Sequence, residues 1–222
     1  MKCIVLALIC LATLAAVPPS EIDWHPVEQL TGSFERVSLV TSNDQPMPVG
    51  VVVITGLVPT QRQVGTIKET LQVSAEKALA LVETIDFTVE RQELAIGTRP
   101  SPEQAPEWKP LSLKAAIAVL QKVKTEVKDV VEPSQISPVF TMPLPSVVGG
   151  WPKSITHPKL TAEFQLFRFM DFTVQPSRHY RYRFRFEYIN PQFKTSRDPF
   201  IAAGETRLTP WSLPSPTVTV SP

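Results

Sequence analysis

Residues 180–188 read Tyr-Arg-Tyr-Arg-Phe-Arg-Phe-Glu-Tyr, and this stretch decides the fold class. An aromatic residue stands at every second position, and charged residues fill the positions between them. Because successive side chains of a β-strand point to opposite faces, this period of two places all the aromatic rings on one face and the charges on the other. The pattern predicts an antiparallel strand with one buried face, which Asn190 and Pro191 end.

The residues on either side of this strand carry a resemblance. Pro176 lies four residues before Tyr180, and a Trp-Ser-Leu-Pro sequence at 211–214 precedes the alternating residues 217–220. Together with the aromatic period of 180–184, this spacing resembles strands E, F and G of fibronectin type III domains. The resemblance implies that the Tyr180 hydroxyl bonds to backbone upstream of it. It also implies structural roles for five residues, which are Pro176, Tyr180, Tyr182, Phe184 and Trp211.

Several other stretches have the periodicity of strands. Residues 34–40 and 85–94 alternate, and the β-branched run 49–55 predicts a strand that is buried on both faces. A shorter strand is expected at 139–142, and residues 107–111 resemble the short strand that follows strand C in fibronectin type III domains.

Two stretches change to the period of a helix. Residues 61–83 and 112–131 repeat apolar side chains at intervals of three and four, which predicts amphipathic helices, the first capped by Thr60. Residues 134–158, rich in proline and glycine, and the polar residues 192–210 are expected to be long loops.

The predicted fold is therefore mainly β with inserted helices, in the α+β class. We expect a fibronectin type III or immunoglobulin-like antiparallel sandwich that carries two amphipathic helices, at about 61–83 and 112–131. An alternative arrangement is a β-α-β unit formed by residues 49–55, the first helix and residues 85–94.

The chain as a whole also resembles a group of uncharacterised secreted or membrane-anchored planctomycete proteins. The shared features are an apolar run that ends in Thr-Gly-Leu-Val-Pro at 55–59, Val-Glu-Arg at 89–91, a proline-rich stretch at 141–145, and residues 171–183. This resemblance implies no known activity.

The first residues predict export from the cytoplasm. Residues 3–17 form an apolar stretch after Lys2, with Thr13 its only polar residue and no charge, which is typical of a secretory signal peptide, and an uncleaved signal anchor is the alternative. Residues 18–32 are expected to be a linker, and residues 33–222 a single domain. Both cysteines, Cys3 and Cys10, lie in the first stretch, so a processed chain has no disulfide and no thiolate. The protein is expected to be secreted, periplasmic, or membrane-anchored on the extracytoplasmic side.

The amino-acid composition and net charge limit the classes of ligand that the protein is expected to bind. The 222 residues are 43% hydrophobic, enough for a substantial core, and the 23 prolines against 8 glycines favour stiff loops. A net charge of +1 gives no general case for binding nucleic acid. Membrane contact is expected only through the N-terminal segment, if it is not cleaved.

No catalytic motif stands out. His25, His157 and His179 are isolated from one another, and none has a second ligand at metal-binding spacing. Asp171 and Glu163 flank an aromatic strand and are expected on a solvated strand face. The chain is therefore predicted not to be an enzyme and to need no metal or cofactor, and a hydrolase with a convergent site is the least favoured hypothesis.

The sharpest candidate site is a row of arginines. Arg181, Arg183 and Arg185 alternate along one strand face, with Arg178 just before them, and their guanidinium groups are suited to bidentate bonds with sulfate, carboxylate or phosphate. The competing interpretation is structural. Their stems would then cover the sheet, or they would pair with acids such as Glu187, Glu163 or Glu90.

These observations favour a non-catalytic extracytoplasmic binding or assembly protein of the cell envelope, with an envelope protein as its partner. The alternative is an accessory module that binds anionic polysaccharide or another carbohydrate. That module would use Arg181, Arg183 and Arg185, with a contribution from Trp108, Trp151 or Trp211.

Overall fold

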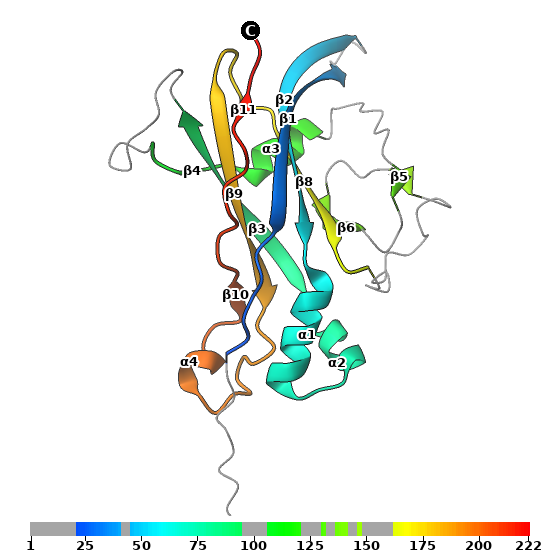
Figure 1. The fold of residues 1–222 in the computed structure, drawn as a ribbon, viewed down its shortest axis with the longest axis vertical. Helices are drawn as coiled ribbons and strands as arrows, with labels where there is room; N and C mark the ends of the chain where they lie inside the picture. The colour runs from blue at the N-terminus through cyan, green and yellow to red at the C-terminus, as the bar shows by residue number, and fades with distance from the viewer. Residues whose placement is uncertain are drawn as a thin grey trace, which may run out of the picture.

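The computed structural model describes residues 21–40, 45–94, 106–120, 130–131, 136–141, 146–147 and 162–222. In these parts the fold is mainly β, with antiparallel strand pairs in two larger sheets and a few short helices (Figure 1). The predicted mainly β class with inserted helices is therefore confirmed. None of the helices in the described ranges is both long enough and apolar enough to cross a membrane.

The first sheet contains the run that was expected to be buried on both faces. Its strand order is β1-β2-β8-β6, with β1 at Glu28–Val40, β2 at Pro46–Val58, β8 at Gln165–Asp171 and β6 at Ile136–Thr141. β2 is antiparallel to β1 and β8, whereas β6 runs parallel to β8. The four residues 51–54 of β2 are all buried, as predicted for a strand without alternation.

The second sheet is centred on the alternating strand. The strand order is β10-β9-β3-β4, with β10 at Thr206–Leu208, β9 at His179–Ile189, β3 at Thr84–Leu94 and β4 at Lys109–Pro110, and β11 (Val218–Thr219) also pairs with β9. Side chains 180–188 of β9 are alternately buried and half-buried. The predicted antiparallel strand with one buried face is confirmed.

Both sheets contribute to one aromatic core. Phe167 of β8 meets Phe184 of β9 edge to face, with ring centroids 4.5 Å apart, and Phe87 of β3 lies 5.4 Å from Phe167. Val52 and Ile54 of β2 belong to the same buried cluster. The aromatic face of β9 is therefore buried in the core, which leaves its arginine face directed outward.

The segment between β2 and β3 corrects two predictions. Residues 61–83 do not form one helix: α1 (Thr60–Leu71) ends at Gln72, which has a left-handed φ of 52°, and Ser74 then caps α2 (Ala75–Ala80). Thr60 is not the cap, because it is the first helical residue and its hydroxyl bonds to the carbonyl of Val58. The alternative β-α-β unit is also wrong, since β2 and β3 belong to different sheets.

Further corrections concern the second helix and the long loops. Within the expected helix 112–131, α3 spans Leu113–Leu120, but β5 (Val130–Val131) is a strand paired in parallel with β7 (Ser146–Val147), so the helix does not reach 131. Of residues 134–158, β6 belongs to the first sheet. Residues 192–210 include α4 (Pro199–Ala202) and β10, so they are not simply a loop.

The expected linker is also partly wrong. Trp24 is buried and stacks on Tyr188 of β9, with ring centroids 4.8 Å apart, and Ile22 and Val27 are buried too. β1 already begins at Glu28. The stretch from 21 onward is extended, as a linker would be, but its apolar side chains close one end of the core.

Candidate functional site

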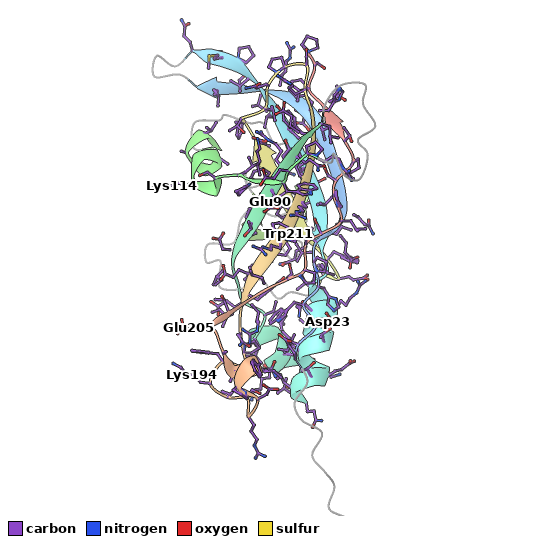
Figure 2. The ribbon with its side chains drawn as sticks, turned by 90° about the vertical axis from the view of Figure 1, so that its left-hand side faces the viewer. Asp23, Glu90, Lys114, Lys194, Glu205 and Trp211 are labelled. Carbon is purple, nitrogen blue, oxygen red and sulfur yellow. The ribbon has the colours of Figure 1, made fainter. Side chains whose placement is uncertain are left out.

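The arginine row lies on the outer face of the second sheet. Strand pairing sets Arg181, Arg183 and Arg185 of β9 opposite Gln92, Glu90 and Thr88 of β3, respectively. Because directly paired residues of antiparallel strands share a face, all six project away from the core. Figure 2 shows Glu90 and Trp211 on this part of the molecule, at mid-height.

Arg183 is held by an acid and two indoles. Its Nε and Nη2 both donate to Oε2 of Glu90, at 2.8 and 2.6 Å. Its guanidinium carbon lies 4.7 Å from the ring centroid of Trp108 and 4.4 Å from that of Trp211. Glu90 was one of the acids expected to pair with the row, and here it neutralises the central arginine.

Arg185 is held differently. Its guanidinium carbon lies 4.5 Å from the ring centroid of Trp211, so this indole contacts both Arg183 and Arg185. Within the described parts of the chain, no carboxylate pairs with Arg185, and its buried Nε has no hydrogen-bond acceptor. Arg185 is therefore a cation that is positioned by an aromatic ring and left without a neutralising acid.

The two remaining arginines are bound more loosely. Nε of Arg181 donates to the backbone carbonyl of Ser215 across 3.4 Å, which is a long hydrogen bond. Arg178 forms an ion pair with Glu93 at 3.2 Å, and both side chains are about half exposed. Of the three arginines on the outer face, Arg183 is neutralised, and Arg181 and Arg185 lack a carboxylate partner among the described residues.

Trp211 is placed by a hydrogen-bonded edge that the sequence analysis missed. The backbone N–H groups of Thr209, Ser212 and Ser215 donate to the carbonyls of Phe186, Phe184 and Tyr182 of β9. The hydroxyl oxygens of the same three residues accept from the N–H groups of the same three β9 residues, at 3.0–3.1 Å. The signal available in the sequence was a hydroxyl residue at every third position, at 209, 212 and 215.

A buried acid, Asp171, lies on the core side of β9, opposite to the arginine face. Asp171 is only 2% exposed, so its expected place on a solvated face is wrong, although Glu163 is exposed. Oδ2 of Asp171 accepts a hydrogen bond from Arg91 Nη1 at 2.7 Å and another from the Tyr182 hydroxyl at 2.9 Å. Oδ1 of Asp171 accepts from the backbone N–H and the hydroxyl of Thr173. We call Asp171, Arg91 and Tyr182 the inter-sheet clamp, because β8, β3 and β9 each supply one member.

The clamp shifts two ionisation equilibria. Burial and then the neighbouring charge of Asp171 raise the pKa of Tyr182 far above its ordinary value, so this phenol stays protonated. For Arg91, burial lowers the pKa, but the charge and hydrogen bond of Asp171 outweigh burial and raise it. The Asp171 carboxylate therefore accepts hydrogen bonds from two side chains of the other sheet, Arg91 and Tyr182.

The Tyr180 corner has the hydrogen bond that the resemblance implied. The Tyr180 hydroxyl accepts from the backbone N–H of Gln175 at 3.1 Å, and its ring is buried. The turn that follows Pro176 includes Ser177 with a left-handed φ of 59°. Arg91 also lies over the Tyr180 ring at 4.7 Å, so the corner and the inter-sheet clamp are in contact.

The histidines do not gather. His25 Nε2 contacts the hydroxyl of Thr66 at 2.9 Å, and His179 Nδ1 contacts that of Thr219 at 2.8 Å, while His157 and Trp151 lie outside the described residues. No group of three His, Cys, Asp or Glu side chains that could hold a metal occurs in the ranges that the structure describes.

No protein-family model, curated protein or solved structure matches this chain.

Proposed function

We propose that this protein is a non-catalytic extracytoplasmic binding or assembly protein of the cell envelope, and that it contacts an envelope protein through the outer face of the second sheet. The supporting observation is the arrangement of Trp108, Arg183, Trp211 and Arg185, in which indoles and guanidinium groups alternate in contact. Stacking fixes the side chains before a partner arrives, which reduces the entropy lost on binding. Aromatic and arginine side chains are also the types that dominate protein interfaces.

The fold we propose is a fibronectin type III-like sandwich. The two sheets with a shared aromatic core, the order β1-β2-β8 against β4-β3-β9, and the Tyr180 hydroxyl bond support it. Sheets of this kind act through exposed faces, edges and loops, so the fold accommodates the proposed role without determining it.

In-cell photocrosslinking tests the protein-partner proposal. A benzoylphenylalanine replacing Thr88, which is opposite Arg185, should give a discrete adduct with an envelope protein. The same probe replacing Glu69, which is exposed on α1, serves as the control and should give none. Absence of an adduct at position 88, or equal adducts from both positions, would count against this face as the contact surface.

A second candidate function is the binding of anionic polysaccharide. The specific observation in its favour is Arg185, which has no carboxylate partner in the described structure. Retention of the chain lacking residues 1–17 on a heparin column, across a salt gradient, tests this candidate. A triple Arg181→Gln, Arg183→Gln, Arg185→Gln variant should elute earlier than a matched Lys68→Gln, Lys77→Gln, Lys194→Gln variant. Equal elution of the two variants would exclude a specific role for the arginine row.

A further inference from the structure

The Phe200 side chain is exposed to solvent at one end of the molecule. It lies in α4 and is 87% exposed, whereas its neighbour Ile201 is buried beneath it. A single exposed apolar residue is common on protein surfaces. The conformation of the surrounding loop distinguishes this one, because many hydrogen bonds fix the backbone that carries it.

Arg207 and Asn190 brace this loop from inside. The guanidinium group of Arg207 donates to four backbone carbonyls, those of Phe200, Ile201, Ala203 and Thr206, at 2.6–3.2 Å. The side-chain amide of Asn190 donates to the carbonyls of Ile201 and Gly204, each at 3.1 Å. Phe200 therefore sits on a rigid support and cannot easily fold back onto the domain.

The chain enters the domain at the same end. Glu21, the first described residue, approaches Arg207 with 3.7 Å between Oε1 and Nε. Figure 1 shows the start of the described chain beside α4, and Figure 2 shows Lys194 and Glu205 at this end. The apolar residues 3–17 precede Glu21 by only four residue steps, which can span at most about 14 Å.

The charges around Phe200 nearly balance. Lys194, whose Nζ lies 4.4 Å from the Phe193 ring centroid, and Arg197 are exposed cations of this loop. Asp198, which caps α4, and the exposed Glu205 offset them. A membrane–water interface accepts an aromatic ring in its headgroup layer while the charged side chains around the ring stay in water.

We propose that residues 3–17 remain as a membrane anchor and that the α4 end of the domain rests on the same membrane, with Phe200 inserted into the headgroup layer. This inference rests on the extracytoplasmic location in the proposed function, but it does not use the arginine face. It adds a membrane contact to the one expected from the N-terminal segment. Because the local charges offset one another, insertion of Phe200 drives the contact and anionic lipid has little effect.

Spin-label accessibility tests the contact with the full chain in phosphatidylcholine vesicles. Cys3→Ala and Cys10→Ala variants remove the other thiols, and Phe200→Cys then carries a nitroxide. Leu213→Cys is the matched control, because Leu213 is 85% exposed but lies beside the middle of β9, next to Ser212. The ratio of oxygen to aqueous nickel-complex collisions should be several-fold higher for the label at 200 than at 213, and should change little when phosphatidylglycerol is added.

Two results would overturn the inference. Labels at 200 and 213 that are equally accessible to the nickel complex would place Phe200 in water and away from the membrane. Mass spectrometry showing that cells release a chain that begins near residue 18 would remove the anchor. Neither result bears on heparin retention or on crosslinking at position 88, so failure of this inference is distinguishable from failure of the proposed function.

Discussion

The hydroxyl of Tyr182 donates to Oδ2 of Asp171 across 2.9 Å, and this bond connects the second sheet to the end of β8 in the first. Arg91 donates to the same oxygen at 2.7 Å from the neighbouring strand β3. Because Asp171 is almost wholly buried, its charge is tolerated only while these donors surround it. The inter-sheet clamp therefore makes the alignment of the sheets depend on one polar cluster at the edge of an aromatic core.

Breaking the clamp should destabilise the fold in a graded way. Tyr182→Phe removes one charged hydrogen bond and should lower the free energy of unfolding by about 1.5–3 kcal/mol. Asp171→Ala leaves Arg91, whose side chain is 19% exposed, without its acid and should cost about 3–5 kcal/mol. Urea unfolding of each variant measures these values. Equal stability of the parent and Asp171→Ala chains would contradict the role of the clamp.

Buried tyrosines predict a loss of stability in alkali. Burial raises the pKa of Tyr188 to about 12, although its hydrogen bond with Thr84 lowers it, and the pKa of Tyr182 is also raised. An unfolded tyrosine ionises near pH 10, so above this pH the folded state binds more protons than the unfolded state. The contribution of each buried tyrosine to the free energy of unfolding is complete below pH 10. Above pH 10 it should fall by about 1.4 kcal/mol per pH unit for each tyrosine, and for Tyr188 this fall should end at about pH 12.

Removing one phenolic hydroxyl group shows which tyrosine causes the loss of stability in alkali. Tyr188→Phe should unfold at lower urea concentration than the parent at pH 8, but its stability should fall less steeply between pH 10 and 11.5. Unfolding midpoints across this range give both slopes. Identical slopes for the two chains would mean that Tyr188 does not titrate as its burial implies.

The edge of β9 should be sensitive to loss of a hydroxyl group. The Ser212 hydroxyl accepts from the buried N–H of Phe184 at 3.0 Å, so Ser212→Ala leaves that donor unsatisfied and should cost about 1–3 kcal/mol. Ser33→Ala is the matched control, because the Ser33 hydroxyl bonds to Glu35 on the exposed surface, and should change stability by less than about 0.5 kcal/mol. Similar midpoints for the two variants would show that water replaces the Ser212 hydroxyl.

Local periodicity predicted the central strands because their burial follows directly from it. The alternation of 180–188 identifies the core face of β9, and the uniform run 51–54 identifies a strand covered on both sides. Helix boundaries were less predictable, since the apolar spacing continues across Gln72. Two local signals were nevertheless present: Ser74 precedes the first turn of α2, and Asp198 with Pro199 begins α4.

The polar parts of the candidate site depended on contacts between distant residues. The residues near Asp171 in the sequence do not indicate its partner Arg91, which is 80 residues away. Asp171 was therefore expected on a solvated face. One local clue existed, because Asp171 Oδ1 accepts from the N–H of Thr173 two residues later, as Asx turns do. Similarly, the arginine row was visible, but strand pairing and the path of residues 209–215 decide which arginine meets Glu90 and which meets only Trp211.

Single substitutions should separate the roles of the arginines in anion binding. Arg183→Gln leaves Glu90 without its donor and should lower stability by about 1.5–3 kcal/mol. Made together with Glu90→Gln, which removes the acid as well and keeps the net charge of the face, Arg183→Gln should cause little loss of heparin retention. Arg185→Gln loses only the contact with Trp211, about 0.5–1 kcal/mol, but removes an unneutralised cation and should elute at clearly lower salt. Paired unfolding and column measurements test this contrast. If the Arg183→Gln, Glu90→Gln chain elutes earlier than Arg185→Gln while remaining folded, Arg183 and not Arg185 contacts the polyanion.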